Sequence, residues 1–156
     1  MATTEVSRLI RAPRSRVYRA LLDPDAVQHW MVPHGMTSEV HTFEPHEGGG
    51  FRISLTYDEP TDTGKTTSET DSFHGRFVQL VPDTKVVQVV EFETDDASVS
   101  GEMTISYTLI DAADGTQVTG LHENLPPGVD PADNELGWTI SLGKLADLLE
   151  GEPPPP

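Results

Sequence analysis

Apolar and polar residues alternate along the middle of the chain, and this alternation predicts a series of antiparallel strands. Apolar side chains occupy every second position in 51–57 and again in 103–109, as in a strand with one buried face. Turn residues separate further segments of strand composition at 38–44, 70–81, 85–94 and 116–124. In 86–92 apolar residues occupy both even and odd positions, so the pattern does not identify a buried face. The polar stretch 58–69 is expected to form a long, mobile hairpin loop.

Two short helices are predicted ahead of this run of strands. A short strand at 4–11 ends before Pro13, and Pro13 suits the first position of a helix because its missing N–H is not needed there. Asp23 then fits the N-cap of a second helix, which starts at Pro24 and runs to Trp30.

The last predicted element is a long helix that begins after Asp130. One apolar stripe runs along it, made of Trp138, Leu142, Leu145 and Leu149. Leu136 and Ile140 lie almost opposite this stripe, so they either pack on the short helices or form an exposed interface that would permit a homodimer. Residues 151–156 include four prolines and are expected to be a disordered tail beyond a single domain at 1–150.

The order of these elements predicts an α+β fold. Strands that follow one another in sequence form an antiparallel meander, here of about six to seven strands including the first one. The apolar face of such a sheet needs one large partner, which the final helix supplies. A curved sheet wrapped around a long helix leaves a space between the two layers, and that space is a natural ligand cavity.

Composition and charge exclude several classes of function. The 156 residues carry 10 Lys and Arg against 26 Asp and Glu, for a net charge of −16, which disfavours nucleic acids and anionic membranes as partners. Without cysteine, the chain has no disulfide, thiolate metal site or cysteine nucleophile. No apolar run is long enough to span a membrane, and no signal peptide is evident, so the expected location is the cytoplasm.

Positive charge is concentrated at the start of the chain. Residues 1–20 carry a net charge of +4, and the remaining residues carry −20. Arg14, Arg16 and Arg19 fall on the first predicted helix, which we expect beside the cavity entrance. There they would either neutralise acids of the same chain or meet an acidic ligand or partner.

Motifs for catalysis or metal binding are weak. Gly64-Lys65-Thr66 resembles the end of a phosphate-binding loop, but the required first glycine is replaced by Glu59. The six histidines show no metal-ligand spacing, and no serine occupies a nucleophile elbow. We therefore expect no catalytic residue, no metal and no cofactor.

Several short motifs occur in an informative order: Arg11-Ala12-Pro13 with Val17-Tyr18-Arg19-Ala20-Leu21, Asp23-Pro24 with Trp30 and Pro33, Gly48-Gly49-Gly50-Phe51-Arg52, Gly75-Arg76-Phe77 with Pro82, Gly115-Thr116 with His122, and Gly137-Trp138. Together they resemble the domain named after the activator of heat-shock protein 90 ATPase, within the START-like (SRPBCC) helix-grip superfamily. The resemblance extends from about Glu5 to Leu149 and implies the helix-grip fold.

Members of this superfamily bind hydrophobic ligands, cyclise polyketides or assist a chaperone, and fold alone does not choose among these functions. The resemblance favours binding of a small hydrophobic or aromatic molecule, and whether a reaction is catalysed stays open. One alternative is a cyclase- or aromatase-like enzyme that uses His122 or Tyr107 for proton transfer. Another is a chaperone-interaction module that uses the arginines of the first helix, although the additional domain of the eukaryotic co-chaperone has no counterpart in these residues.

Candidate ligand-binding residues are those expected between the sheet and the final helix: Trp30, Phe51, Ile53, Met103, Tyr107, His122, Trp138 and Leu142. His122 and Glu123 are neighbours on a strand and point to opposite faces, so they cannot form an acid–base pair inside the cavity. His122 is either an orienting group for the ligand or a satisfied histidine at a strand end that is hydrogen-bonded to the backbone.

Overall fold

The computed structural model describes residues 2–32, 35–58 and 70–150. The elements in chain order are β1 (Ala2–Ile10), α1 (Arg14–Leu21), α2 (Pro24–Trp30), β2 (Met36–Phe43), β3 (Gly50–Tyr57), β4 (Thr70–Val81), β5 (Lys85–Phe92), the short 3-10 helix η1 (Ala97–Val99), β6 (Met103–Ala112), β7 (Gly115–Leu125) and α3 (Pro131–Glu150). The predicted loop at 58–69, except for Asp58, lies outside the described residues. So do the 64–66 triplet and the predicted tail at 151–156.

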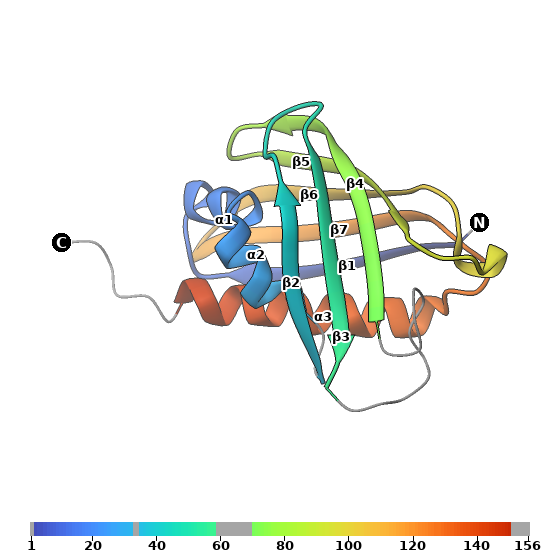
Figure 1. Cartoon of the computed structure of the whole chain (residues 1–156). Helices are drawn as coiled ribbons and strands as arrows, with labels where there is room; N and C mark the ends of the chain where they lie inside the picture. The colour runs from blue at the N-terminus through green and yellow to red at the C-terminus, as the bar shows by residue number, and fades with distance from the viewer. Residues whose placement is uncertain (1, 33–34, 59–69, 151–156) are drawn as a thin grey trace.

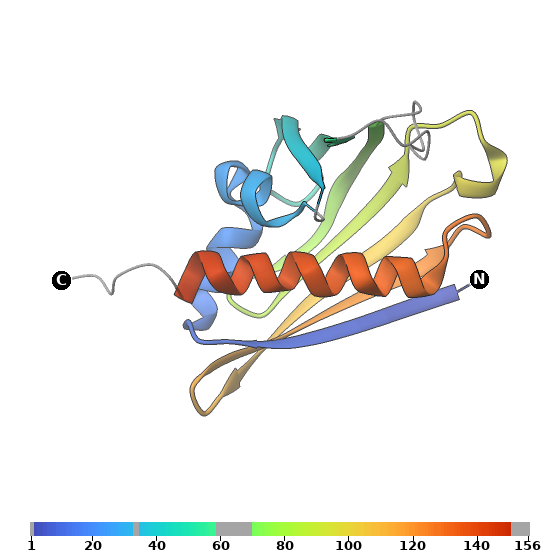
Figure 2. The same ribbon diagram turned by 90° about the horizontal axis from the view of Figure 1, so that it is seen from below.

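Seven strands form one antiparallel sheet in the order β1-β7-β6-β5-β4-β3-β2 (Figure 1). The first strand therefore pairs with the last one, while α1 and α2 carry the chain from β1 at one edge to β2 at the other. Figure 2 shows α3 lying along one face of the curved sheet, with α1 and α2 beside its C-terminal half. The predicted α+β helix-grip architecture is confirmed.

Strand register identifies the buried face that the sequence pattern left open. In β5 the side chains of Val86, Gln88 and Val90 are buried, whereas Val87 and Val89 lie on the opposite face and are partly exposed. Gln88 pairs with Ile105 of β6, so this polar residue faces the same side of the sheet as the buried half of β6. Apolar residues on the outer face of β5 explain why the alternation did not identify the buried face of this strand.

The two short helices differ in how they begin. Pro13 is the N-cap of α1 with an extended backbone, so the helix starts one residue later than predicted. Asp23 caps α2 as predicted, because its carboxylate accepts a hydrogen bond from the Asp25 N–H at 3.0 Å. None of the described helices combines the length and the hydropathy needed to cross a membrane.

Candidate functional site

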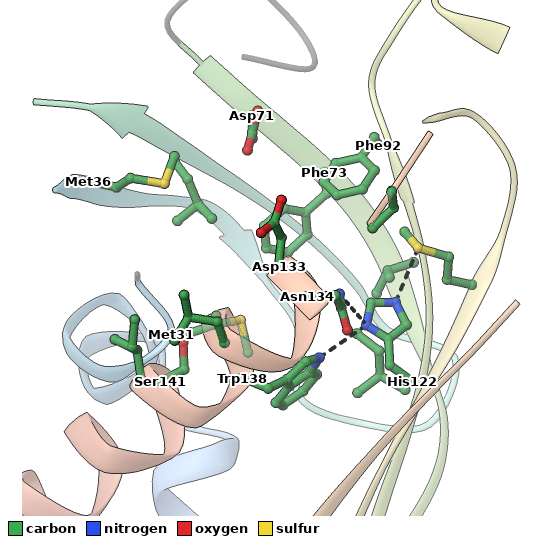
Figure 3. A pocket seen from close by; sticks show the side chains of 18 of the residues that line it. Met31, Met36, Asp71, Phe73, Phe92, His122, Asp133, Asn134, Trp138 and Ser141 are labelled. Carbon is green, nitrogen blue, oxygen red and sulfur yellow. Dashed lines mark hydrogen bonds between the residues drawn. The ribbon is translucent and has the colours of Figure 1, made fainter. Parts of the chain in front are cut away.

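A cavity of about 670 Å³ lies between the N-terminal half of α3 and the sheet (Figure 3). Its walls come from β2 to β7, from the end of α2 and from the segment that leads into α3: Trp30, Met31, Met36, Leu55, Tyr57, Asp71, Phe73, Gln88, Val90, Phe92, Met103, Ile105, Tyr107, His122, Gly128, Val129, Asp130, Asp133, Asn134, Leu136, Gly137, Trp138, Ile140 and Ser141. Most of these side chains are apolar or aromatic. The cavity therefore lies where a sheet wrapped around one helix was expected to leave space.

Strand β6 and the glycine opposite it shape the inner wall. Met103, Ile105 and Tyr107 alternate along β6 and all face α3. Gly120 of β7 pairs with Tyr107, and a Cβ atom at Gly120 would lie 3.2 Å from the indole ring of Trp138. The missing side chain thus lets Trp138 lie close against the sheet, where its ring meets Tyr107 at a centroid distance of 5.4 Å.

His122 connects three elements through a network of hydrogen bonds. Its Nδ1 accepts from the Trp138 indole N–H at 3.1 Å and from the Asn134 amide at 3.3 Å (Figure 3). The Asn134 carbonyl oxygen in turn accepts from the hydroxyl of Thr4, which pairs with His122 in the β1–β7 register. Because Nδ1 accepts, the ring proton resides on Nε2, which faces the sulfur of Met103 at 3.1 Å.

Burial keeps the His122 imidazole neutral. Only 5% of the residue is exposed, and this desolvation lowers the pKa of His122 from 6.5 to about 4. Both ring nitrogens already have partners within the fold. The arrangement holds Trp138 in place. The histidine is satisfied, as in one of the two alternatives raised by the sequence, but by side chains and not by the backbone that was expected. The partners are side chains on α3 and β6.

Tyr107 differs from His122 because its polar group lacks a hydrogen-bond partner. Its hydroxyl is buried and has no hydrogen-bond partner among the described residues. Burial raises the pKa of Tyr107 far above its usual range, so the phenol stays protonated and is able to donate. The ring itself is fixed between Trp138 and Trp30, whose ring lies edge-on to Tyr107 at 6.1 Å.

A phenylalanine at position 107 is expected to stabilise the protein without ligand. An unsatisfied buried hydroxyl costs about 1–3 kcal/mol, and Tyr107→Phe removes it while keeping the ring contacts. Urea denaturation should therefore give an unchanged or higher free energy of unfolding for the variant. A clear loss of stability would show that the hydroxyl has a partner.

Five of the eight candidate residues from the sequence line the cavity, namely Trp30, Met103, Tyr107, His122 and Trp138. Phe51, Ile53 and Leu142 are buried in the core and are not among the lining residues. Phe51 packs against Phe77 at a ring distance of 5.3 Å. These three residues face inward as expected, but other side chains fill the space around them.

Several lining residues were missed or interpreted differently from sequence. Leu136 and Ile140 line the cavity, and Leu136 is also 59% exposed, so the alternative of an exposed interface stays a prediction. Asn134 lies one turn before Trp138, and its polar side chain in the first turn of α3 gave no signal. Gln88 lay in the segment whose buried face was ambiguous. Only its burial in the fold, at 3% exposure, identifies it as a polar group of the inner wall.

The arginines of α1 do not lie at the cavity entrance, which corrects the sequence-based expectation. No residue of α1 is among the lining residues that the structure describes. Arg14 pairs with Asp111 at 2.8 Å and also donates to the Asp83 carbonyl, and Arg16 donates to the Leu149 carbonyl at 2.9 Å. For Arg14, neutralisation of acids of the same chain is the alternative observed.

Comparisons with known proteins agree with this architecture. The model of the family described as Activator of Hsp90 ATPase homolog 1-like protein matches residues 11–150. A search of the curated proteins gives no match. Among solved structures, a protein from Chromobacterium violaceum is 31% identical with a TM-score of 0.85, and the match covers 96% of this chain and 98% of that one.

Two more distant structures share the fold. An AHSA1-like protein from Aeromonas hydrophila is 16% identical with a TM-score of 0.71, and the match covers 96% of this chain and 93% of that one. DynU16, a protein from the dynemicin biosynthetic locus, is 23% identical with a TM-score of 0.67. That match covers 97% of this chain and 48% of DynU16.

Proposed function

The chain belongs to the family of Activator of Hsp90 ATPase homolog 1-like proteins, and on that premise we propose that it binds a small hydrophobic or aromatic molecule between the sheet and α3. The observation that carries this proposal is the cavity itself. Its volume of about 670 Å³ is in the usual range for a ligand site, and its walls are mainly apolar. The few polar lining residues, among them Gln88, Asn134 and Ser141, would orient a bound molecule.

The nature of the walls supports an aromatic or flat ligand. Trp30, Tyr107 and Trp138 form a continuous row of rings along the inner wall. Met31 and Met103 add flexible, polarisable side chains that adapt to an irregular ligand surface. Rigid aromatic rings with flexible methionine side chains beside them suit ligands that differ in shape but share a flat apolar face.

The arrangement of His122 argues against the form of the cyclase-like alternative in which His122 transfers the proton. A proton-transfer group works best when its pKa is near the working pH, whereas the pKa of His122 is lowered to about 4 by burial. Its Nδ1 is also occupied by the indole of Trp138. Binding without proton transfer by this residue is the function that its geometry favours.

The chaperone-interaction alternative would use Arg14, Arg16 and Arg19 of α1 to bind an acidic partner. Arg14 and Arg16 are held by groups of the same chain, and a partner would have to displace these contacts. Each such surface contact contributes little to stability. Breaking it nevertheless reduces the free energy that an acidic partner gains by binding the arginine. The cavity is therefore the better supported site.

Replacing Trp138 by alanine is expected to weaken ligand binding about tenfold, or about 1.4 kcal/mol, because the variant loses the aromatic wall next to Tyr107. A suitable probe is 1-pyrenebutanol, whose emission reports transfer into an apolar site, with native mass spectrometry for the expected ratio of one to one. The matched control is Ile110→Ala, since Ile110 is 56% exposed and lies on the other face of β6. A folded Trp138→Ala protein with wild-type affinity would contradict this site.

A further inference from the structure

A buried glutamine lies in the sheet wall of the cavity. Gln88 of β5 is 3% exposed and is one of the lining residues. Its neighbours on the same face of the sheet are apolar: Val86 and Val90 flank it along β5, and Phe77 and Ile105 are its partners on the adjacent strands. These four side chains are buried as well. The Gln88 amide is therefore surrounded, within the sheet, by apolar side chains.

The Gln88 amide has no hydrogen-bond partner within the described part of the chain. Polar side-chain atoms that are both unpaired and fully enclosed occur among the described residues only in Ser38 and Tyr107. The unpaired amide of Gln88 is not fully enclosed, so it opens into the cavity that the residue lines. A buried amide without a partner costs free energy, because it has given up bonds to water. Its free donor and acceptor point to a bound molecule that pairs with them.

A second unpaired polar group comes from the helix on the other side of the cavity. Ser141 of α3 is 7% exposed and lines the cavity (Figure 3). Thr139, two residues earlier, donates its hydroxyl to the Glu135 carbonyl at 2.8 Å, as hydroxyl side chains inside helices often do. The Ser141 hydroxyl makes no such bond to any residue that the structure describes. Free hydrogen-bonding groups therefore face the cavity from both walls, the sheet and α3.

The surroundings of Gln88 favour an uncharged ligand group. A charged group placed beside Val90 and Ile105 would lose its hydration, and the neutral amide offers no opposite charge in return. A carbonyl or hydroxyl group has less hydration to lose, and a hydrogen bond to the amide replaces it. Because an amide has both N–H donors and a carbonyl acceptor, Gln88 is able to pair with either group.

We propose that Gln88 anchors the ligand, and that this ligand is an apolar or aromatic molecule with an uncharged carbonyl or hydroxyl group. This inference rests on the proposed binding function and specifies its ligand class. The polar group of the ligand would meet the Gln88 amide on the sheet, and its apolar body would lie against Met103 and Trp138. Ser141 would pair with a second polar group in ligands that have one.

Two naphthalene probes of the same shape test the role of the ligand's polar group. 2-Acetylnaphthalene carries a carbonyl, and 2-isopropenylnaphthalene has a CH₂ group in place of the carbonyl oxygen. Isothermal titration calorimetry gives the dissociation constant of each probe. The quantity to compare is the ratio of the two constants in each protein, because the different tendency of the probes to leave water is the same for every variant.

Variants assign the hydrogen bond to Gln88. Gln88→Met keeps the length of the side chain but removes the amide, so the ratio should shift about tenfold against the ketone. Gln88→Leu should give the same shift with a different side-chain shape. Urea denaturation should show both variants to be at least as stable as wild type, because they lose an unpaired buried amide.

Two further variants are controls. Gln79→Met is matched to Gln88→Met, since Gln79 occupies an exposed position on β4 and does not line the cavity. Ser141→Ala removes the other unpaired polar group of the cavity wall. With these probes, which have one polar group at most, both controls should keep the wild-type ratio.

The outcomes distinguish this inference from the function beneath it. If neither probe binds the wild-type protein, the proposed binding function fails and this inference fails with it. If both probes bind and the two Gln88 variants keep the wild-type ratio, the function stands and Gln88 is not the anchor, since water then satisfies its amide. A ratio that shifts in Ser141→Ala or Gln79→Met as much as in Gln88→Met also overturns the assignment. A shift confined to the Gln88 variants supports both proposals.

Discussion

Replacing Trp30 by alanine is expected to lower the free energy of unfolding by about 3–5 kcal/mol, the usual range for a fully buried tryptophan. Trp30 is 0% exposed and ends the short helix α2. Its indole N–H donates to the carbonyl of Ala20 at 3.0 Å, which ties α2 to α1, and its ring packs on Tyr107 of β6. A helix of seven residues has little stability of its own, so this anchor determines its position.

Two further variants test whether the loss of stability in Trp30→Ala comes from the specific contacts of Trp30 or from the removal of any apolar side chain. Trp30→Phe keeps an aromatic ring but loses the hydrogen bond, and it should cost about 1–2 kcal/mol. Leu136→Ala changes an apolar side chain that is 59% exposed and should cost about 0.5 kcal/mol or less. Urea denaturation followed by circular dichroism measures all three. If the free energy of unfolding of Trp30→Ala lies within about 1 kcal/mol of the wild-type value, well below the range for a new cavity, then α2 is not needed to close the core.

The strands could be predicted from sequence where only one face of the sheet is buried. Residues 51–57 and 103–109 alternate strictly, and both lie in strands with the expected face inside. In β5 the outward-facing Val87 and Val89 break the alternation, although both are only partly buried. The first helix was displaced by one residue, since proline suits both the N-cap and the following position.

The site was harder to predict because core and cavity walls share one pattern. Ile53 and Leu142 satisfy the same inward periodicity as Met103, and only packing in three dimensions decides which of them borders empty space. Leu136 shows the converse, since it lines the cavity although it lies off the apolar stripe of α3. Polar lining residues such as Asn134 depend on contacts between distant segments, and no local signal encodes them.

Acidification should test the network around His122 through the stability of the fold. The folded protein holds a neutral imidazole because burial lowers the pKa of His122 to about 4, whereas the unfolded chain has the ordinary value of 6.5. Between these values the unfolded chain binds the proton and the folded protein does not, so stability falls as the pH falls from 6.5 to 4. The full effect amounts to about 3 kcal/mol, and it is absent above pH 7.

The variant His122→Gln isolates this contribution from the carboxylates that also titrate in acid. Glutamine does not titrate, and its amide is able to accept from Trp138 and to donate toward Met103. The other ionisable groups of the cavity, Asp71, Asp130 and Asp133, are common to both proteins, so the difference between the two stabilities cancels their effect. We expect the wild type to lose about 3 kcal/mol relative to the variant between pH 7 and pH 4. A difference that stays constant over this range would mean that the His122 ring is hydrated in the folded protein, and the nearby wall of the cavity would then be wet.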